Sequence, residues 1–344
     1  MSRAATGELS FRWVAAAAGI LLVSLLAGLA IGPVPISLAG IVDDGLARLS
    51  LTDPGGGLSP LDAAIVWELR APRVVLGAMV GGMLALAGGA YQAVFRNPLA
   101  DPYLLGAAAG AGLGATIALA YGEGGGALLP LAAFAGGAAA AAAAYLLGAT
   151  TVAGQRTATL LLAGVAVASF LTALQTFVLQ QNSETVREVY SWILGQLDTA
   201  DSGDVVLVAP YIVVSAAVIL IHRRVLDVLR VGDEEARSLG VNVGRVRLIV
   251  LSAATVGTAA AISVTGLIGF VGIIVPHAVR LIAGASYRVV LPLSLLFGGS
   301  FLVLADIVAR IALAPAELPI GVVTAAVGAP FFAVVLRSSR LLRT

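Results

Sequence analysis

The sequence contains no cysteine and no lysine, so all 20 of its basic residues are arginine. Without cysteine the chain can form neither a disulfide nor a thiolate metal site. Without lysine it cannot contain the lysine-bearing phosphate loop of ATPases, and it cannot form a lysine Schiff base. If ATP hydrolysis drives this protein, a different chain must carry out that hydrolysis.

Charge of either sign is scarce. Charged residues make up 11% of the 344 residues, hydrophobic residues make up 59%, and the mean hydropathy is +1.01. A soluble globular chain is closer to a quarter charged, and it needs more polar surface than this sequence offers. The 41 glycines fit a membrane protein, because bilayer helices pack through small residues such as Gly110 and Gly114, which lie four apart. The composition predicts an all-α membrane protein with one transmembrane domain over residues 1–344.

About ten apolar segments approach the roughly 20 residues that a bilayer-crossing helix needs. They lie near Val14–Ile31, Val74–Phe95, Leu104–Tyr121, Leu128–Ala149, Thr159–Leu179, Val205–Ile221, Val246–Val264, Leu267–Ala283, Val290–Ala309 and Ile320–Leu336. The first segment could also be a secretory signal, but no clean small-x-small cleavage site follows it. We therefore expect ten transmembrane helices.

The placement of the arginines orients these segments. With both termini in the cytoplasm, 15 arginines fall on the inner side and five on the outer side, as the positive-inside bias requires. The outer five are Arg48, Arg70, Arg73, Arg187 and Arg310. We expect a multi-pass protein of the cell membrane with cytoplasmic termini.

A cytoplasmic stretch at about 223–247 contains the pattern of a short helix. Within it, Gly232–Gly240 begins with glycine and three acids, which suit a helix N-terminus, and it ends on a glycine that suits the position after a C-terminus. Its small apolar face would comprise Val231, Ala236 and Leu239. Because the acids would repel anionic lipid, we expect this helix to dock another protein rather than lie on the membrane.

Two proline-containing segments interrupt the apolar pattern. In Arg96–Pro102, two prolines in five positions forbid a continuous helix, and Asn97 can bond its own backbone. We expect a rigid turn there, either a plain loop or a constriction at the inner mouth of a pore. In Gly266–Arg280, three glycines and a proline predict a broken or re-entrant helix. His277, beside that proline, is more often structural than a ligand.

Polar residues on the exterior side have two interpretations each. Arginine binds carboxylates in bidentate fashion, so Arg70, Arg73 and Arg310 suit either docking of an acidic partner or anchoring at the membrane interface. Gln175, in the outer half of the fifth segment, suits either a contact with a substrate or an interhelical hydrogen bond.

No enzyme chemistry is predicted. The chain has two histidines, no HExxH motif and no paired carboxylates within its apolar segments, so we expect no catalytic and no metal-binding residues. We also expect no cofactor and no nucleic-acid partner. An ion-gradient-driven secondary transporter is the alternative function, but such proteins place several ionisable groups inside the bilayer, and here only Asp306 lies within a predicted span.

Taken together, the segments resemble the permeases of type II ABC importers for cobalamin, haem and iron–siderophore complexes. The matching pieces, in family order, are Arg70–Arg73, Gly88–Gln92, Asn97–Pro102, Leu105–Gly106, Leu160–Gly164, Trp192–Gly195, Gly232–Gly240, Gly269–Arg280 and Glu317–Phe332. They extend over nearly the whole chain, which makes the resemblance specific. Trp192–Gly195 is closer to the iron-chelate branch.

The resemblance implies the membrane-spanning subunit of an ATP-driven importer for a large metal chelate, which is a ferric siderophore, haem or cobalamin. It implies a homodimer with the pathway at its interface, two ATPase subunits that hold ATP and Mg, and an exterior substrate-binding protein. It further implies a short exterior helix at about 187–198.

Residue roles follow from the same resemblance. Residues that would couple to the ATPase are Asp233, Glu234, Glu235, Ala236, Leu239 and Gly240. Residues that would receive the binding protein are Arg70, Arg73 and Arg310. Residues of the cytoplasmic gate and pathway would be Asn97, Leu99, Thr157, Gln175 and Trp192.

Overall fold

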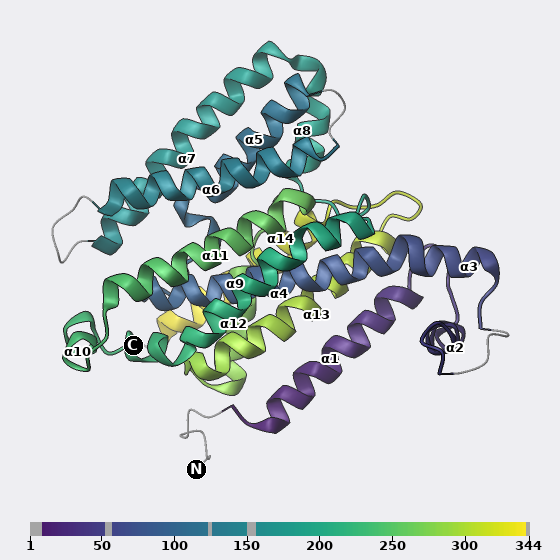
Figure 1. Cartoon of the computed structure of the whole chain (residues 1–344), viewed down its shortest axis with the longest axis horizontal. Coiled ribbons are helices and arrows are strands. Elements are labelled where there is room, and N and C mark those ends of the chain that lie inside the picture. Colours follow the sequence, from purple (N-terminus) through teal and green to yellow (C-terminus); the bar gives the residue numbers. More distant parts are fainter. Residues whose placement is uncertain (1–8, 52–56, 123–125, 150–155, 342–344) are drawn as a thin grey trace.

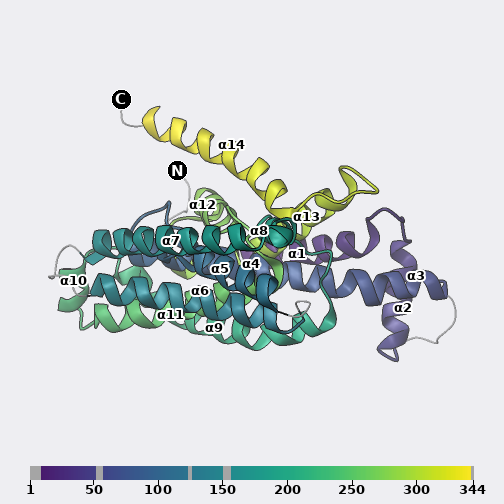
Figure 2. The ribbon, with the colours of Figure 1, turned by 90° about the horizontal axis from the view of Figure 1, so that it is seen from above.

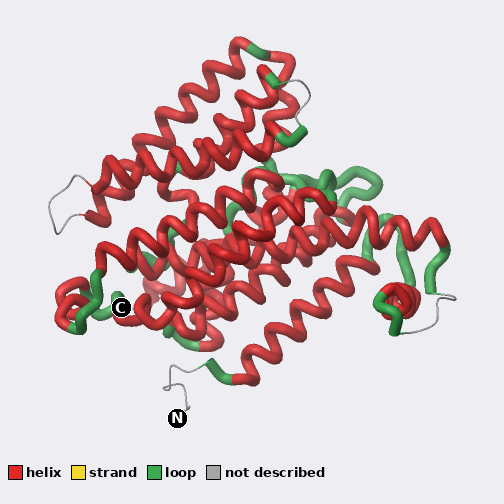
Figure 3. The backbone as a smooth tube through the Cα atoms, viewed as in Figure 1, coloured by secondary structure: helices red, strands yellow, loops and turns green. Residues whose placement is uncertain are grey.

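The computed structural model describes residues 9–51, 57–122, 126–149 and 156–341. These residues are mostly helical, and short loops join the helices (Figure 3). Within the described ranges no strand forms, and the only β-type pairing is an isolated bridge between Leu313 and Ala316. The predicted all-α fold is confirmed.

Apolar helices occupy all ten positions predicted for membrane spans. They are α1 (Phe11–Ala30), α4 (Ala71–Phe95), α5 (Ala107–Tyr121), α6 (Leu128–Ala149), α7 (Arg156–Gln181), α9 (Ser202–Val228), α11 (Val243–Thr265), α12 (Val271–Ala283), α13 (Tyr287–Ile311) and α14 (Ile320–Leu341). In the described part of the chain, seven helices are long and apolar enough to cross a membrane. The shorter apolar helices are α5, α12 and the stretch of α14 up to Val335.

Short helical elements lie between these spans. They are α2 (Leu38–Arg48), α3 (Pro60–Ala64), the π-helical turn η1 (Ile65–Arg70), the 3-10 turns η2 (Pro102–Leu105) and η3 (Ser183–Thr185), α8 (Val186–Ile193) and α10 (Asp233–Ser238). The sequence did not predict α2, because its two aspartates mask the few apolar positions that it buries. It predicted α8 and α10 as short helices, and both are present.

Several predicted boundaries need correction. The connection predicted at 223–247 is shorter, because α9 continues to Val228 and α11 already begins at Val243. Arginine side chains near a helix end can reach water while their stems stay on the apolar surface, so a helix need not stop at the first charge. The exterior helix predicted at 187–198 ends at Ile193.

The second span also begins earlier than predicted. Ser59 caps the helix by accepting a hydrogen bond from the Asp62 backbone amide, and the helical backbone then continues through η1 into α4. Arg70 and Arg73 therefore lie within a continuous helical rod and not at its end. The sequence pattern placed the start at Val74 because these charges resemble a boundary.

At the centre of the molecule lies α4, which contacts α9, α11, α12 and α13 (Figure 1). Every residue from Val80 to Phe95 is buried, as expected for a helix that is apolar on all sides. A second layer of α5, α6 and α7 joins this body through contacts between α6 and α11, and α1 packs on α13.

The helix backbones around α4 approach each other at glycines. A Cβ atom at Gly88 would overlap the carbonyl oxygen of Gly272 in α12, and one at Gly81 would overlap the carbonyl oxygen of Gly298 in α13. Gly110 of α5 faces Gly136 of α6 in the same manner. Small residues thus set the distance between helices, as membrane packing requires.

Two spans are completed by irregular backbone. The 15 residues of α5 and the 13 residues of α12 rise about 22 and 20 Å, less than the roughly 30 Å of a bilayer core. Segments 96–106 and 266–270, which precede these helices, are largely non-helical. The predicted break is confirmed at Gly266 and Phe270, whose φ angles are +68° and +69°.

The ends of the bundle are distinct. The last turn of α14, the first turn of α1 and α10 lie toward one end, whereas α2 and α3 lie toward the other (Figures 1 and 2). The location of the two termini in the cytoplasm stays a prediction.

Replacing Gly88 by alanine should destabilise the protein by about 1–3 kcal/mol, because the new methyl group overlaps backbone of α12 that cannot rotate away. Thermal unfolding in detergent measures the effect. Gly19→Ala in α1 is the matched control, since no atom lies within 4 Å of its added Cβ. Equal melting temperatures for the two variants would contradict the close α4–α12 contact.

Candidate functional site

The helix α10 presents a mostly polar surface at its end of the bundle. Glu234 and Glu235 are exposed, and the side chain of Leu239 is 68% exposed. Ala236 is completely buried against the bundle. The apolar face predicted for this segment is therefore divided, because Ala236 points inward whereas Val231 and Leu239 face outward.

Asp233, the first residue of α10, differs from its acidic neighbours because it is bound within the chain. Its two carboxylate oxygens each accept a hydrogen bond from Arg247 of α11, both at 2.9 Å, and it forms an ion pair with Arg96 at the end of α4. Burial and the nearby charge of Arg247 lower the pKa of the Arg96 guanidinium, whereas Glu235 raises it. Asp233 thus holds together two arginines that would otherwise repel each other.

The turn predicted after α4 is confirmed. Arg96 has a left-handed backbone with φ of +49°, which ends the helix. The Asn97 side chain accepts a hydrogen bond from the Leu99 amide at 3.0 Å, and its carbonyl accepts one from the Ala100 amide at 3.1 Å. Leu99 is 39% exposed at the surface of this turn.

The predicted gate residue Thr157 is only partly placed by the structure. Its backbone belongs to the first turn of α7, but its side chain lies outside the described residues. Whether it approaches Asn97 stays a prediction.

The proline turn and the glycine-rich break, far apart in sequence, lie together. The Tyr103 hydroxyl donates to the Ile268 carbonyl at 3.0 Å and accepts from the Ile268 amide at 3.2 Å. Gln92 donates to the Gly272 carbonyl at 3.0 Å, and its side-chain oxygen accepts from Arg280. The two bonds of Tyr103 satisfy the non-helical backbone at Ile268 inside the bundle, as a membrane interior demands.

Arg73 and Arg310, two of the arginines predicted to lie on the exterior side, form a buried ionic cluster. Arg73 donates to Asp306 of α13 at 2.7 and 2.9 Å and to both carboxylate oxygens of Glu317 at 3.1 and 2.7 Å. Arg310 lies 3.0 Å from Asp306 and donates to the Gly28 carbonyl at 3.0 Å. Asp306 is 1% exposed, so its charge depends on these two arginines.

Arg70 has a different set of partners. Its guanidinium donates to the carbonyl oxygens of Leu29, Ala30 and Val34 at 2.5–3.0 Å, which clamps the end of α1 onto η1. Arg70, Arg73 and Arg310 are each buried. The sequence placed them on an exterior docking surface, whereas in this structure their guanidinium groups are directed into the protein.

Two other predicted pathway residues are also buried. Gln175 donates a hydrogen bond to Thr116 of α5 at 3.0 Å, which is the interhelical alternative given above. Trp192 is 3% exposed, but it lines one wall of a hollow of about 740 Å³ between α8 and the α5–α6 connection. Polar residues of that hollow are Glu184, Thr185, Glu188, Ser191, Gln196 and Thr199.

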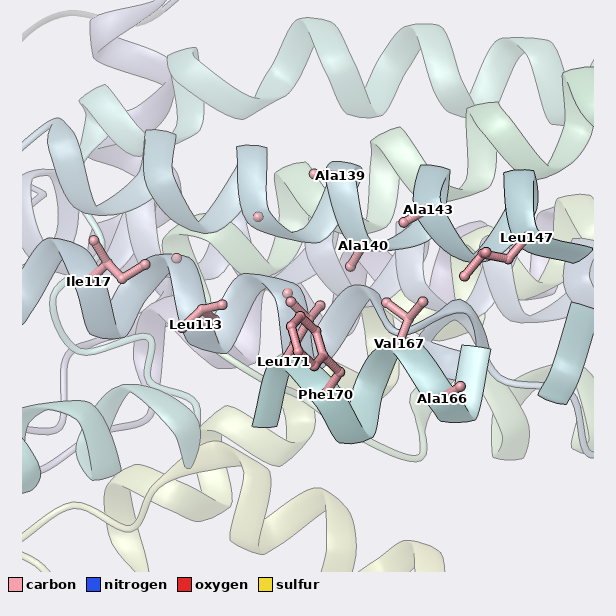
Figure 4. A pocket seen from close by; sticks show the side chains of 13 residues that line it. Leu113, Ile117, Ala139, Ala140, Ala143, Leu147, Ala166, Val167, Phe170 and Leu171 are labelled. Carbon is pink, nitrogen blue, oxygen red and sulfur yellow. The ribbon is translucent and has the colours of Figure 1, made fainter. Parts of the chain in front are cut away.

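A second hollow, of about 600 Å³, lies between α5, α6 and α7 and was not predicted (Figure 4). Its lining includes Gly110, Gly136, Leu147, Val167 and Phe170, and no lining side chain is polar. It can accommodate an apolar chain but offers no hydrogen bond to a polar substrate. Over the described ranges, no group of three histidines or carboxylates is placed to hold a metal ion.

These features define a class of protein, a multi-pass α-helical membrane protein. The model of the FecCD transport family matches residues 20–338. The chain therefore belongs to the FecCD transport family, and it is a permease subunit of an ABC importer rather than an enzyme. The family predicted from the ordered motifs is confirmed.

Two relatives and one solved structure illustrate the similarity. The cobalamin import system permease protein BtuC of Halobacterium salinarum is 42% identical over 96% of this chain and 98% of its own. The Fe(3+)-citrate import system permease protein YfmD of Bacillus subtilis is 37% identical over 81% and 83%. An inward-facing metal-chelate type ABC transporter has a TM-score of 0.82 at 26% identity, covering 95% of this chain and 99% of that structure.

Asp306→Asn should cost about 3–5 kcal/mol of stability, because it leaves the buried Arg73 and Arg310 without their shared anion. Glu317→Gln should cost less, since the Glu317 side chain is 31% exposed and water can replace it. Thermal unfolding of both variants in the same lipid mixture tests this order, and a reversed order would refute it.

Tyr103→Phe removes one hydroxyl group but leaves both the amide and the carbonyl of Ile268 without that partner. We expect a loss of about 1–3 kcal/mol. Tyr190→Phe is the control, because the Tyr190 side chain is 60% exposed. Unfolding midpoints that agree for the two variants would show that the Tyr103 contact does not support the break before α12.

Proposed function

We propose that this permease imports a corrinoid, with cobalamin as the first candidate, and that ferric chelates are the second candidate class. The observation that carries the proposal is the 42% identity, over nearly the full length of both chains, to a cobalamin import permease. The relative named for ferric citrate matches less of the chain at lower identity. Trp192–Gly195 alone favours iron chelates, but Trp192 is largely buried.

The proposed assembly is a homodimer with the pathway between the two copies. On α7, the exposed residues Thr172, Thr176 and Gln180 are spaced by four and share a face. The helix α14 diverges from the rest of the bundle toward its C-terminal end (Figure 2), and it exposes Val327 and Val334. Because a second copy would cover α14 and leave the polar stripe of α7 facing a central channel, both features support this arrangement.

In the proposed mechanism, ATP and Mg are held by two separate ATPase subunits, and this chain carries no cofactor. The α10 end is assigned to the cytoplasm by the excess of arginine there. The exposed residues Glu234, Glu235 and Leu239 would contact the ATPase. ATP-driven approach of the two ATPases would move α10 and switch the channel between outward and inward access. The permease breaks no bond, because its task is to bias two states.

Docking of an exterior binding protein at Arg70, Arg73 and Arg310 remains part of the proposal. It requires these groups to exchange internal partners for carboxylates of the binding protein. Of the two carboxylates that bind these arginines, Glu317 is the more accessible, with a side chain 31% exposed against 2% for Asp306, and it precedes α14. Its displacement from Arg73 would free the chain that leads into α14, the helix that the second copy would cover.

The test is uptake into proteoliposomes that contain the permease with its ATPase and binding protein, with membrane gradients collapsed. We expect ATP-dependent accumulation of cobalamin and little accumulation of haem or a ferric siderophore. A matched preparation with a hydrolysis-deficient ATPase should accumulate none of the three.

Two outcomes would contradict the proposal. Preferential uptake of a ferric siderophore would show that the substrate is a ferric chelate and not cobalamin, whereas the proposed importer mechanism would stand. Uptake that needs an ion gradient and no ATP would instead support the alternative, a secondary transporter.

A further inference from the structure

We propose that Asp233 is a positioning residue that ties α10 to the end of α4, so that movement of α10 also moves the turn at Asn97. The inference rests on the proposed function, because it assigns a mechanical step between the ATPase and the gate. It differs from the sequence-based prediction, in which Asp233 contacts the ATPase together with Glu234 and Glu235.

The geometry of three separate elements supports this role. Asp233 begins α10, Arg247 belongs to α11, and Arg96 ends α4. The Asp233 side chain is only 26% exposed, and its carboxylate is shared between the two arginines. The bidentate pair with Arg247 fixes the orientation of the carboxylate, since two parallel hydrogen bonds allow little rotation. Arg96 contacts the same carboxylate oxygen, Oδ1, that accepts a hydrogen bond from Nη2 of Arg247.

Arg96 is well placed to pass a displacement to the turn, because it is the residue directly before Asn97. Backbone amides of both residues donate to the Gln92 carbonyl, so the turn is attached to the last turn of α4. The Asn97 side chain closes the turn by binding the Leu99 amide. A short, internally bonded turn moves as a unit, whereas a flexible loop would absorb the motion.

Asp233 is the anion that Arg96 and Arg247 share. Removing its charge would leave these two arginines as like charges with no shared anion, and α10 would lose its link to the end of α4. Removing the Arg96 charge would release α4 and leave the Asp233–Arg247 pair in place. The two changes break the same link, so their effects should not add.

The experiment compares wild type, Asp233→Asn, Arg96→Gln, the double variant and Arg96→Lys as complete complexes in proteoliposomes. The readout is cobalamin transported per ATP hydrolysed, alongside copurification of the ATPase and thermal stability. We expect both single variants to lower this ratio about three- to tenfold while the ATPase still copurifies. The double variant should match the single variants, and Arg96→Lys should retain most of the ratio.

Asp44→Asn is the matched control, because it removes an ion pair with Arg48 at the opposite end of the molecule. An unchanged ratio in both Asp233→Asn and Arg96→Gln, with wild type active, would overturn the inference. Loss of ATPase copurification in Asp233→Asn would also overturn it, because Asp233 would then be a docking residue. If a variant is too unstable to assay, Asp233→Glu and Arg96→Lys supply the comparison. Absence of ATP-driven transport in wild type would instead refute the proposed function.

Discussion

Burial of α4 on all sides is the constraint on which the rest of the structure depends. Close approach at Gly81 and Gly88 brings α13 and α12 against its backbone, which leaves no room for a side chain at either contact. In a bilayer no hydrophobic force gathers helices, so this packing must supply the association. A helix packed this tightly moves as a rigid rod, because its surroundings permit discrete shifts but little bending. The contacts at the two ends of α4 therefore determine which movements pass from one end of the bundle to the other.

Each end of this rod carries an ionic cluster. At one end, Arg73 binds Asp306 and Glu317, and Glu317 lies shortly before α14. At the other end, Arg96 meets Asp233, the first residue of α10. Buried charges are expensive unless paired, so the Arg73–Asp306 pair favours one defined arrangement and penalises partial separation. The Arg96–Asp233 pair is partly exposed, so its separation costs less.

Much of this organisation could be predicted from the sequence. Apolar length located the ten apolar helices, Gly266 marked the break before α12, and the acids after Gly232 located α10. The clusters could not be predicted, because the partners of Arg73 and Asp233 lie far away in sequence or across a helix junction. From composition alone, a charged residue near an apolar segment indicates the end of a helix. For this reason the sequence placed Arg70 and Arg73 at the start of a helix that in fact begins at Pro60. Packing decides whether an acidic side chain faces a partner protein or its own bundle. Asp233 is bound within the bundle whereas Glu234 is exposed, and the sequence did not distinguish the two.

The central claim is that α10 and the turn at Asn97 move together. Because the chain has no cysteine, single cysteines at Leu99 and at Ser238 can carry spin labels without background. Pulsed electron paramagnetic resonance would then measure the distance between equivalent labels in the proposed dimer, with and without ATP. The account predicts that both distances change together upon ATP binding. A change at Ser238 with no change at Leu99 would contradict it.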